Sequence, residues 1–145
     1  INAEAPKVLA QKAAELNIPL IHFSTDYVFD GLKKKPYIEI DTTNPQSVYG
    51  KTKLQGEKLV SNHEKHIILR TSWVYSSRGH NFLKTILRLI QEKKSLRIVS
   101  DQKGAPSSSL MLASITFEIV KLIINDKNFK NFGTYHVWGC PRIEI

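Results

Sequence analysis

Two short apolar runs, each ending abruptly in polar residues, constrain the fold of this chain more than any other feature. Residues 18–23 are nearly all apolar and lead into "STDY", and residues 67–71 end in the same way, in "IILRTS". Runs of this length are typical of strands covered on both faces, as in a parallel sheet. Ligands bind outside the carboxyl ends of strands in open α/β sheets, so a site is expected where these runs turn polar.

A segment of helical length precedes each apolar run. Residues 3–16 carry apolar side chains at helical spacing, and Asn17 and Pro19 can end that helix. A second helix is expected to start near Asn44-Pro45, where the asparagine can act as N-cap, and to run to about residue 60. The order helix, strand, helix, strand predicts an α/β fold.

The pattern changes after about residue 75. We expect a helix over 82–90, a short strand over 96–99 and a polar loop over 101–109. A second apolar helix over 110–124 and a strand near 135–138 complete the chain. These segments predict two parts, a sheet-based part over residues 1–76 and a smaller lobe over 77–145.

Charge and hydropathy argue against two classes of partner. The net charge is +8, from 21 Lys and Arg against 13 Asp and Glu, but the basic residues are scattered along the chain. We therefore expect no nucleic-acid binding, although a basic surface can attract an anionic small substrate. The most apolar segment, 110–124, contains Glu118 and Lys121 and is shorter than the ~20 residues that span a bilayer, so no membrane segment is expected.

Cysteine and histidine positions give no sign of a metal centre. Cys140 is the single cysteine, which excludes an internal disulfide and fits a cytoplasmic protein. His63 and His66 lie three residues apart without a nearby cysteine or well-placed acid, so we expect no metal site. His22, inside the first apolar run, is interpreted as a core histidine whose hydrogen bonds are satisfied.

The segment "YGKTK" on the second predicted helix carries the strongest chemical signal. Tyr49 and Lys53 are four residues apart, which places both on one face of a helix. A neighbouring ammonium favours the phenolate, so Tyr49 could exchange a proton with a substrate oxygen near neutral pH. Thr25, just past the first strand, is the candidate for a third group on that oxygen. Each element alone has a structural explanation, because Tyr-x-x-x-Lys arises by chance in helices and Ser-Thr pairs form turns.

Four blocks together resemble one family over nearly the whole chain. They are "STDYVFDG", "NPQSVYGKTKLQGEKLV", "ILRTSWVYSSRGHNF" and "DQKGAPSS". In this order and spacing they resemble the dTDP-4-dehydrorhamnose reductases, which are extended short-chain dehydrogenase/reductases. The resemblance implies a partial Rossmann-like, doubly wound parallel sheet in residues 1–76, which would be the C-terminal part of the NAD(P)-binding domain. Residues 77–145 would then form a small, incomplete C-terminal substrate-binding lobe.

The resemblance also assigns roles to individual residues. Tyr49 would be the general acid in reduction of a 4-keto sugar bound to dTDP, and Lys53 would lower the tyrosine pKa and bind the nicotinamide ribose. Thr25 would hydrogen-bond the reacting oxygen. Asp26 and Trp73 match positions that contact the sugar nucleotide, although Trp73 could equally be a core residue. The implied cofactor is NADPH or NADH; Mg²⁺ accompanies some members, but no acidic cluster here demands it.

One departure from the family is serious. The family begins with a glycine-rich turn that holds the cofactor pyrophosphate, and this sequence contains no Gly-x-x-Gly-x-x-Gly. We therefore expect a fragment that lacks the N-terminal part of the cofactor site. Its first strand would be an exposed edge, which predicts a homodimer or pairing with the missing N-terminal half.

Two alternative functions stay open at this stage. The chain could be a non-catalytic module like the regulatory subunit of methionine adenosyltransferase, which keeps the same fold for binding. It could instead be another sugar-nucleotide epimerase or dehydratase. Dehydratases usually place an acid beside the hydroxyl residue, and here Asp26 follows Thr25 but no glutamate does.

Overall fold

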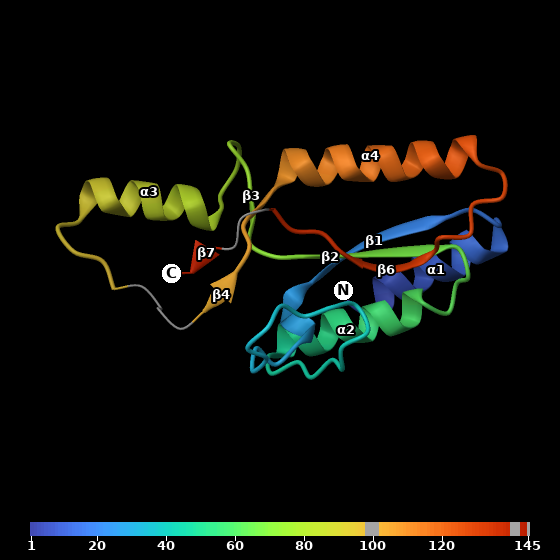
Figure 1. Ribbon diagram of the computed structural model, residues 1–145, viewed down its shortest axis with the longest axis horizontal. Coiled ribbons are helices and arrows are strands. Elements are labelled where there is room, and N and C mark those ends of the chain that lie inside the picture. Colours follow the sequence, from blue (N-terminus) through green and yellow to red (C-terminus); the bar gives the residue numbers. More distant parts are fainter. Residues whose placement is uncertain (98–101, 140–142, 145) are drawn as a thin grey trace. The chain divides into compact units, whose positions relative to one another are not determined.

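The computed structural model, drawn in Figure 1, describes residues 1–97, 102–139 and 143–144. The chain divides into two compact units. The first unit comprises Ile1–Thr71 and Asn128–His136, and the second comprises Ser72–Lys127 and Val137–Ile145. The expected boundary at residue 76 differs from this division. The chain leaves the first unit at Thr71, and residues 128–136 return to it because their strand pairs with the sheet.

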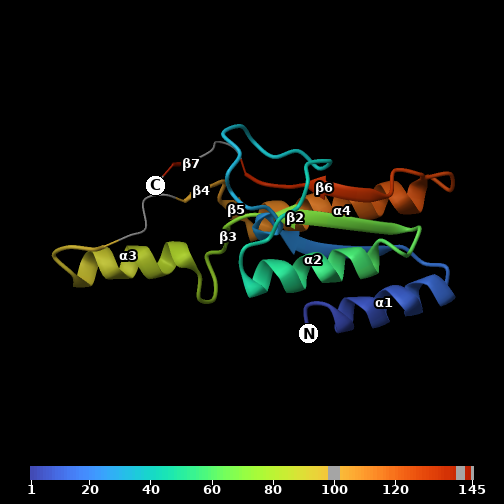
Figure 2. The ribbon, with the colours of Figure 1, turned by 90° about the horizontal axis from the view of Figure 1, so that it is seen from below.

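The first unit is a three-stranded parallel sheet with two helices on one face. Figure 2 shows α1 and α2 side by side beneath the strands, which run in the order β1-β2-β6. Its elements are α1 (Glu4–Glu15), β1 (Leu20–Thr25), the 3-10 helix η1 (Asp26–Val28), α2 (Val48–Val60), β2 (His66–Thr71) and β6 (Gly133–His136). The expected α/β architecture and the expected edge position of the first strand are both observed.

The strand register aligns the carboxyl ends of β1 and β2. Thr25 pairs with Thr71, so the two points at which the sequence turns polar lie next to each other. The Thr71 hydroxyl donates a hydrogen bond to the main-chain oxygen of Ser24 at 3.1 Å and fastens the two ends together. The edge of the sheet expected to carry a site is thus built from two aligned strand ends.

A small apolar core holds the helices on the sheet. Ala10 of α1, Val60 of α2 and Ile68 of β2 are buried together, and Leu20 of β1 packs against them. β2 lies between β1 and β6, and its apolar residues are at most 2% exposed. This burial explains the continuous apolar run that predicted the strand.

The second helix starts later than expected. α2 begins at Val48, and the Ser47 side chain accepts a hydrogen bond from the N–H of Gly50 at 3.0 Å. Asn44, the predicted cap, instead serves the preceding loop. Its main-chain N–H donates to Val28 and its side chain donates to Asp30. The serine therefore satisfies the free N–H at the start of α2.

The apolar residues of α1 divide between a buried and an exposed side. Pro6, Ala10 and Ala13 are buried. The larger side chains are not: Val8, Leu9 and the C-cap residue Leu16 are each more than half exposed. The periodicity predicted the helix correctly, but the small residues make its contact with the sheet.

The second unit contains short strands and two helices. β3 (Val74–Tyr75) pairs in parallel with β5 (Ser107–Ser108), and β4 (Lys103–Gly104) pairs antiparallel with β7 (Ile143–Glu144). Its helices are α3 (Phe82–Glu92) and α4 (Ser109–Asn125). The expected strand over 96–99 is absent at residues 96 and 97, and residues 98 and 99 lie outside the described residues. No helix among the described residues is long and apolar enough to cross a membrane.

Candidate active site

Thr25 ends β1, and local hydrogen bonds fix its hydroxyl. Its Oγ1 accepts from the main-chain N–H of Tyr27 and donates to Oδ1 of Asp26, both at 3.2 Å. Thr25 is only 6% exposed, whereas Tyr27 on η1 is 44% exposed. The polar cluster after the first strand therefore forms a capped turn at the carboxyl end of β1.

Tyr49 and Lys53 lie one turn apart on α2, close to that turn. The rings of Tyr49 and Tyr27 meet edge to face, with centroids 6.0 Å apart. A Cβ on Gly50 would lie 2.2 Å from the main-chain oxygen of Tyr27. Because only glycine permits this approach, Gly50 brings the first turn of α2 against η1. Tyr49 itself remains 49% exposed.

Lys53 joins α2 to β1 directly. Its Nζ donates a hydrogen bond to the main-chain oxygen of Phe23 at 2.6 Å, two residues before Thr25. Burial lowers the pKa of Lys53, and the charge of Glu57 one turn further along opposes that shift. The ammonium has two further N–H donors, which no residue described by the structure engages. Thr25, Asp26, Tyr49 and Lys53 are thus gathered where β1 ends and α2 begins.

Behind Lys53 lies a buried ion pair that no motif predicted. Arg70 of β2 donates from Nε and Nη2 to the two carboxylate oxygens of Glu57, at 3.0 and 2.8 Å. Glu57 is 4% exposed and Arg70 is 6% exposed. The available signal was an arginine inside the apolar run "IILRT", because a buried charge requires a partner. The pair ties α2 to β2, as the lysine ties it to β1.

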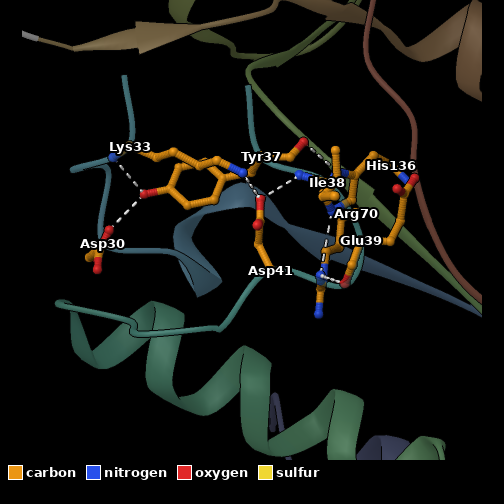
Figure 3. Close-up of polar contacts among 8 residues, drawn as sticks. All are labelled: Asp30, Lys33, Tyr37, Ile38, Glu39, Asp41, Arg70 and His136. Atoms are coloured by element: carbon orange, nitrogen blue, oxygen red, sulfur yellow. Dashed lines mark hydrogen bonds and ion pairs between the residues drawn. The ribbon is translucent and has the colours of Figure 1, made fainter. Parts of the chain in front are cut away.

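The loop between η1 and α2 is held by its own polar contacts (Figure 3). The Tyr37 hydroxyl donates to Oδ1 of Asp30 at 2.6 Å and accepts from the N–H of Lys33 at 3.1 Å. Asp41 pairs with the Lys33 ammonium, which lowers the pKa of the Asp41 carboxyl. The hydrogen bond from Tyr37 likewise lowers the pKa of Asp30.

The same loop is anchored to β2 and β6. Tyr37 stacks on Phe29 with centroids 4.2 Å apart, and the Arg70 guanidinium carbon lies 5.1 Å from the centroid of the Phe29 ring. Arg70 also donates to the main-chain oxygen of Glu39, whose carboxylate accepts from the N–H of His136 at 2.9 Å (Figure 3). That N–H lowers the pKa of Glu39. Arg70 therefore connects the loop, the sheet and α2.

His22 differs from the expectation of a satisfied core histidine. Its Nε2 is buried and makes no hydrogen bond to any residue that the structure describes. Burial and the nearby charge of Lys53 lower the pKa of His22 to about 4, against a smaller opposing effect of Glu57. The ring is therefore neutral at pH 7, close to the charges of Lys53 and Glu57 on α2.

Trp73 lies in the second unit, where it is half-buried with its indole against Gly104. Of the neighbouring polar loop, Gln102, Gly104 and Pro106 are described, and Asp101 lies outside the described residues.

Within residues 1–97, 102–139 and 143–144, no group of three His, Cys, Asp or Glu side chains could hold a metal ion. His63 instead bonds through Nε2 to the main-chain oxygen of Ile18 at 2.8 Å.

Comparison with known proteins gives consistent matches along the chain. The family described as the RmlD substrate binding domain matches residues 1–142. A dTDP-4-dehydrorhamnose reductase of Salmonella typhimurium is 44% identical over 138 residues, which are 94% of this chain and 46% of that protein. The spore coat polysaccharide biosynthesis protein SpsK of Bacillus subtilis is 39% identical over 138 residues, with the same shares covered. The chain thus spans 46% of the length of each of these curated relatives.

Solved structures agree with these matches. A dTDP-4-dehydrorhamnose reductase from Clostridium acetobutylicum superposes with a TM-score of 0.87 at 42% identity, over 99% of this chain and 49% of that one. The Bacillus anthracis dTDP-4-dehydrorhamnose reductase in complex with NADP has a TM-score of 0.84 at 36% identity, with the same shares covered.

Fold and site together define a Rossmann-like α/β protein that carries a Tyr-x-x-x-Lys helix at the carboxyl end of a parallel strand. Within that class, the chain belongs to the RmlD substrate-binding-domain family, the family of the dTDP-4-dehydrorhamnose reductases.

Proposed function

We propose that the whole protein containing this chain reduces the 4-keto group of dTDP-4-dehydro-6-deoxy-L-mannose to give dTDP-L-rhamnose. One observation carries the proposal. The hydrogen bond from Lys53 to Phe23 holds the helix that bears Tyr49 against the end of β1 that bears Thr25. The names of the relatives supply the substrate class, and the chain supplies a proton donor, a cation and a hydroxyl in one place.

NADPH or NADH, when bound, would supply the hydride to C4 of the sugar. Tyr49 donates its phenolic proton to the C4 oxygen as the carbonyl π pair moves onto that oxygen, so an alcohol and a phenolate result. The Lys53 ammonium stabilises the phenolate, and solvent returns the proton to it. Thr25, whose hydroxyl donates to Asp26 in the structure, turns that proton toward the same oxygen when substrate is bound. Asp26 and Trp73 contact the sugar nucleotide.

The residues present fit the nicotinamide end of such a cofactor. Lys53 uses one N–H on Phe23 and keeps two donors for ribose hydroxyls. In this proposal the pyrophosphate-binding turn belongs to a part of the protein outside these 145 residues. The described residues offer no acidic cluster for Mg²⁺, so no step is assigned to that ion.

The same proposal includes a partner for the sheet. β1 is an edge strand of the described sheet, and Phe23 on it is exposed. Val8 and Leu9 of α1 and the following Leu16 are also exposed. We infer that an N-terminal half of the same protein pairs with β1 and covers these side chains; a homodimer through the same edge is the alternative.

A single cysteine is in keeping with a cytoplasmic location.

The test is turnover of the dTDP-linked ketone by the whole protein, followed through loss of reduced nicotinamide. Tyr49→Phe removes only the hydroxyl and keeps the ring that meets Tyr27, so kcat should fall by about 10²–10⁴-fold. Tyr27→Phe is the matched control because that residue is exposed to a similar extent, 44% against 49%, and shares the ring contact. It should retain kcat within about threefold.

Normal turnover by Tyr49→Phe would refute the proton-donor role.

Calorimetry with NADPH and with dTDP separates the enzyme from the non-catalytic alternative. Binding of neither NADPH nor dTDP, together with a tight protein partner, would favour a non-catalytic module. NMR of the product identifies an epimerase or a dehydratase, since only the reductase yields the 6-deoxy sugar reduced at C4.

A further inference from the structure

Trp73 adopts a backbone conformation that bulky residues rarely take. Its φ is +43°, in the left-handed region, where the structure also places Asn17 and three glycines. A tryptophan persists there only when its surroundings hold it, and such residues concentrate at ligand-binding positions. The contacts that hold Trp73 within the second unit therefore need an explanation.

Two of these contacts fix the main chain. The carbonyl oxygen of Trp73 accepts a hydrogen bond from the N–H of Ser107 at 3.2 Å, and the β3–β5 pairing begins at the next residue, where Val74 pairs with Ser107. Ser107 is fully buried, and its hydroxyl accepts from the N–H of Gly139 at 3.3 Å. The carbonyl of Trp73 and the backbone that follows it are thus held by the short β3–β5 ladder.

A third contact fixes the ring. A Cβ on Gly104 would lie 2.5 Å from Cε2 of Trp73 and 2.8 Å from both Cδ2 and Cζ2. Nearly equal distances to three adjoining ring atoms place that point over the face of the indole. Real Cβ atoms do not approach so closely, so the bare backbone of Gly104 is what lets this face lie against β4.

The backbone conformation of residue 104 does not itself require a glycine. Unlike Gly31, Gly79 and Gly133, Gly104 is not in the left-handed region, so any residue could adopt its backbone conformation. The three nearest atoms that a Cβ would meet all belong to the Trp73 ring. The absence of a side chain at residue 104 therefore makes room for the indole of Trp73.

We propose that Gly104 is a positioning residue that sets the plane of the Trp73 indole, so that the accessible part of the ring can stack against the sugar nucleotide. Trp73 is half-buried, with one face on Gly104 and the Phe82 ring at 6.4 Å, tilted by 45°. A flat aromatic ring held in one orientation recognises the apolar face of a sugar or a base at low entropic cost. This inference rests on the proposed function for the identity of the ligand, but not for the position of the ring.

The experiment combines Gly104→Ala with changes at Trp73 in the whole protein. Trp138 is the other tryptophan of this chain, so Trp138→Phe leaves Trp73 as its single tryptophan, which is excited selectively at wavelengths that tyrosine does not absorb. Tryptophans elsewhere in the protein are replaced in the same way. Gly104→Ala should shift the Trp73 emission to longer wavelength and raise quenching by acrylamide, because the added methyl displaces the indole. In the enzyme assay, KM for the dTDP-sugar should rise about tenfold while kcat changes less than about threefold.

A double-mutant cycle then separates positioning from general damage. In a Trp73→Ala background the methyl has no ring to displace, so adding Gly104→Ala should change neither the thermal midpoint nor KM. If Trp73→Ala fails to fold, Trp73→Phe serves instead, and its smaller ring should reduce the effect of the methyl.

The two proposals fail in distinguishable ways. Unchanged Trp73 emission in Gly104→Ala, or the same loss with and without the indole, would overturn the role of Gly104. A displaced indole with unaltered KM would overturn its link to the ligand. Absence of turnover in the unmodified protein would count against the proposed function alone, because the fluorescence result does not depend on turnover.

Discussion

The Nζ atom of Lys53 lies 2.6 Å from the main-chain oxygen of Phe23. One side chain therefore both carries the charge beside Tyr49 and fastens α2 to β1. The position of Tyr49 relative to Thr25 follows from this contact and from the close approach of Gly50 to Tyr27. Changes to the groups around Lys53 should accordingly alter both its titration and the packing of α2.

Removing the Glu57 charge should lower the pKa of Lys53 further. Glu57 opposes the effect of burial on that pKa, and Glu57→Gln leaves the Arg70 charge without its counterion. NMR titration of the Lys53 side chain measures the change, with Glu64→Gln on the exposed surface as the control. An unchanged or raised Lys53 pKa in Glu57→Gln would contradict the electrostatic coupling.

Breaking the Arg70–Glu57 pair should strongly destabilise the protein. Arg70→Met leaves a buried carboxylate unpaired, and we expect a loss of about 3–5 kcal/mol in the free energy of unfolding. The double variant Arg70→Met/Glu57→Leu should recover most of that loss, because no buried charge remains. Urea unfolding provides the measurement. Glu15→Gln, which breaks an exposed pair with Lys12, should cost less than about 1 kcal/mol.

Gly50→Ala should destabilise the protein, although helix propensity predicts the opposite sign. Replacing a glycine in a helix by alanine ordinarily stabilises the protein, by about 1 kcal/mol in a helix interior and by less in the first turn, where Gly50 lies. Here the new Cβ would meet the main-chain oxygen of Tyr27 at 2.2 Å, so α2 must move away from η1. Thermal unfolding compares the variant with wild type, and a raised midpoint would show that the approach of α2 to η1 is looser than described.

His22 should make stability fall as the pH is lowered from 6.5 to 4. Its pKa is lowered from 6.5 to about 4 in the folded state, so the unfolded chain binds the proton more readily in that range. Partial exposure of the ring reduces the effect, and we expect about 1–2 kcal/mol.

His22→Leu should remove this contribution. As the pH is lowered from 7 to 4, the free energy of unfolding of the His22→Leu variant should therefore rise relative to that of the wild-type protein. Other groups also have a lowered pKa in the folded protein and also reduce stability at low pH; they are His136, Asp30, Asp41 and Glu39. Their effects are present in both proteins and cancel in the comparison. Parallel pH profiles would mean that His22 is protonated as readily when folded as when unfolded.

The backbone elements of the first unit could be predicted because apolar residues at helical spacing and in strand-length runs indicate helices and strands, although Val8, Leu9 and Phe23 are exposed. The two strands around His22 and Ile68 and the helix that bears Tyr49 were confirmed by the structure. The start of that helix was misplaced because Asn44 and Ser47 are both good caps. The choice between them depends on Val28 and Asp30, which are distant in sequence.

Other features could not be predicted from local patterns. The Arg70–Glu57 pair joins a strand to a helix, and nothing in the spacing of those residues specifies it. Similarly, the left-handed backbone of Trp73 and the close approach of Gly104 depend on contacts that form only after folding. Sequence motifs identified the residue types of the candidate site, and tertiary packing determined their surroundings.

Because Thr25 pairs with Thr71, the alignment of the candidate site depends on the lengths of the two strands that end there. Side chains alternate between the two faces of a strand. Deleting one residue of Leu20–Thr25 ahead of the threonine would therefore move each side chain on one side of the deletion to the opposite face of the sheet. The threonine hydroxyl would then exchange sides with its neighbour, with almost no change in overall composition. Length variation among homologous chains should consequently be confined to the turns, where a residue can be gained or lost without inverting the strand.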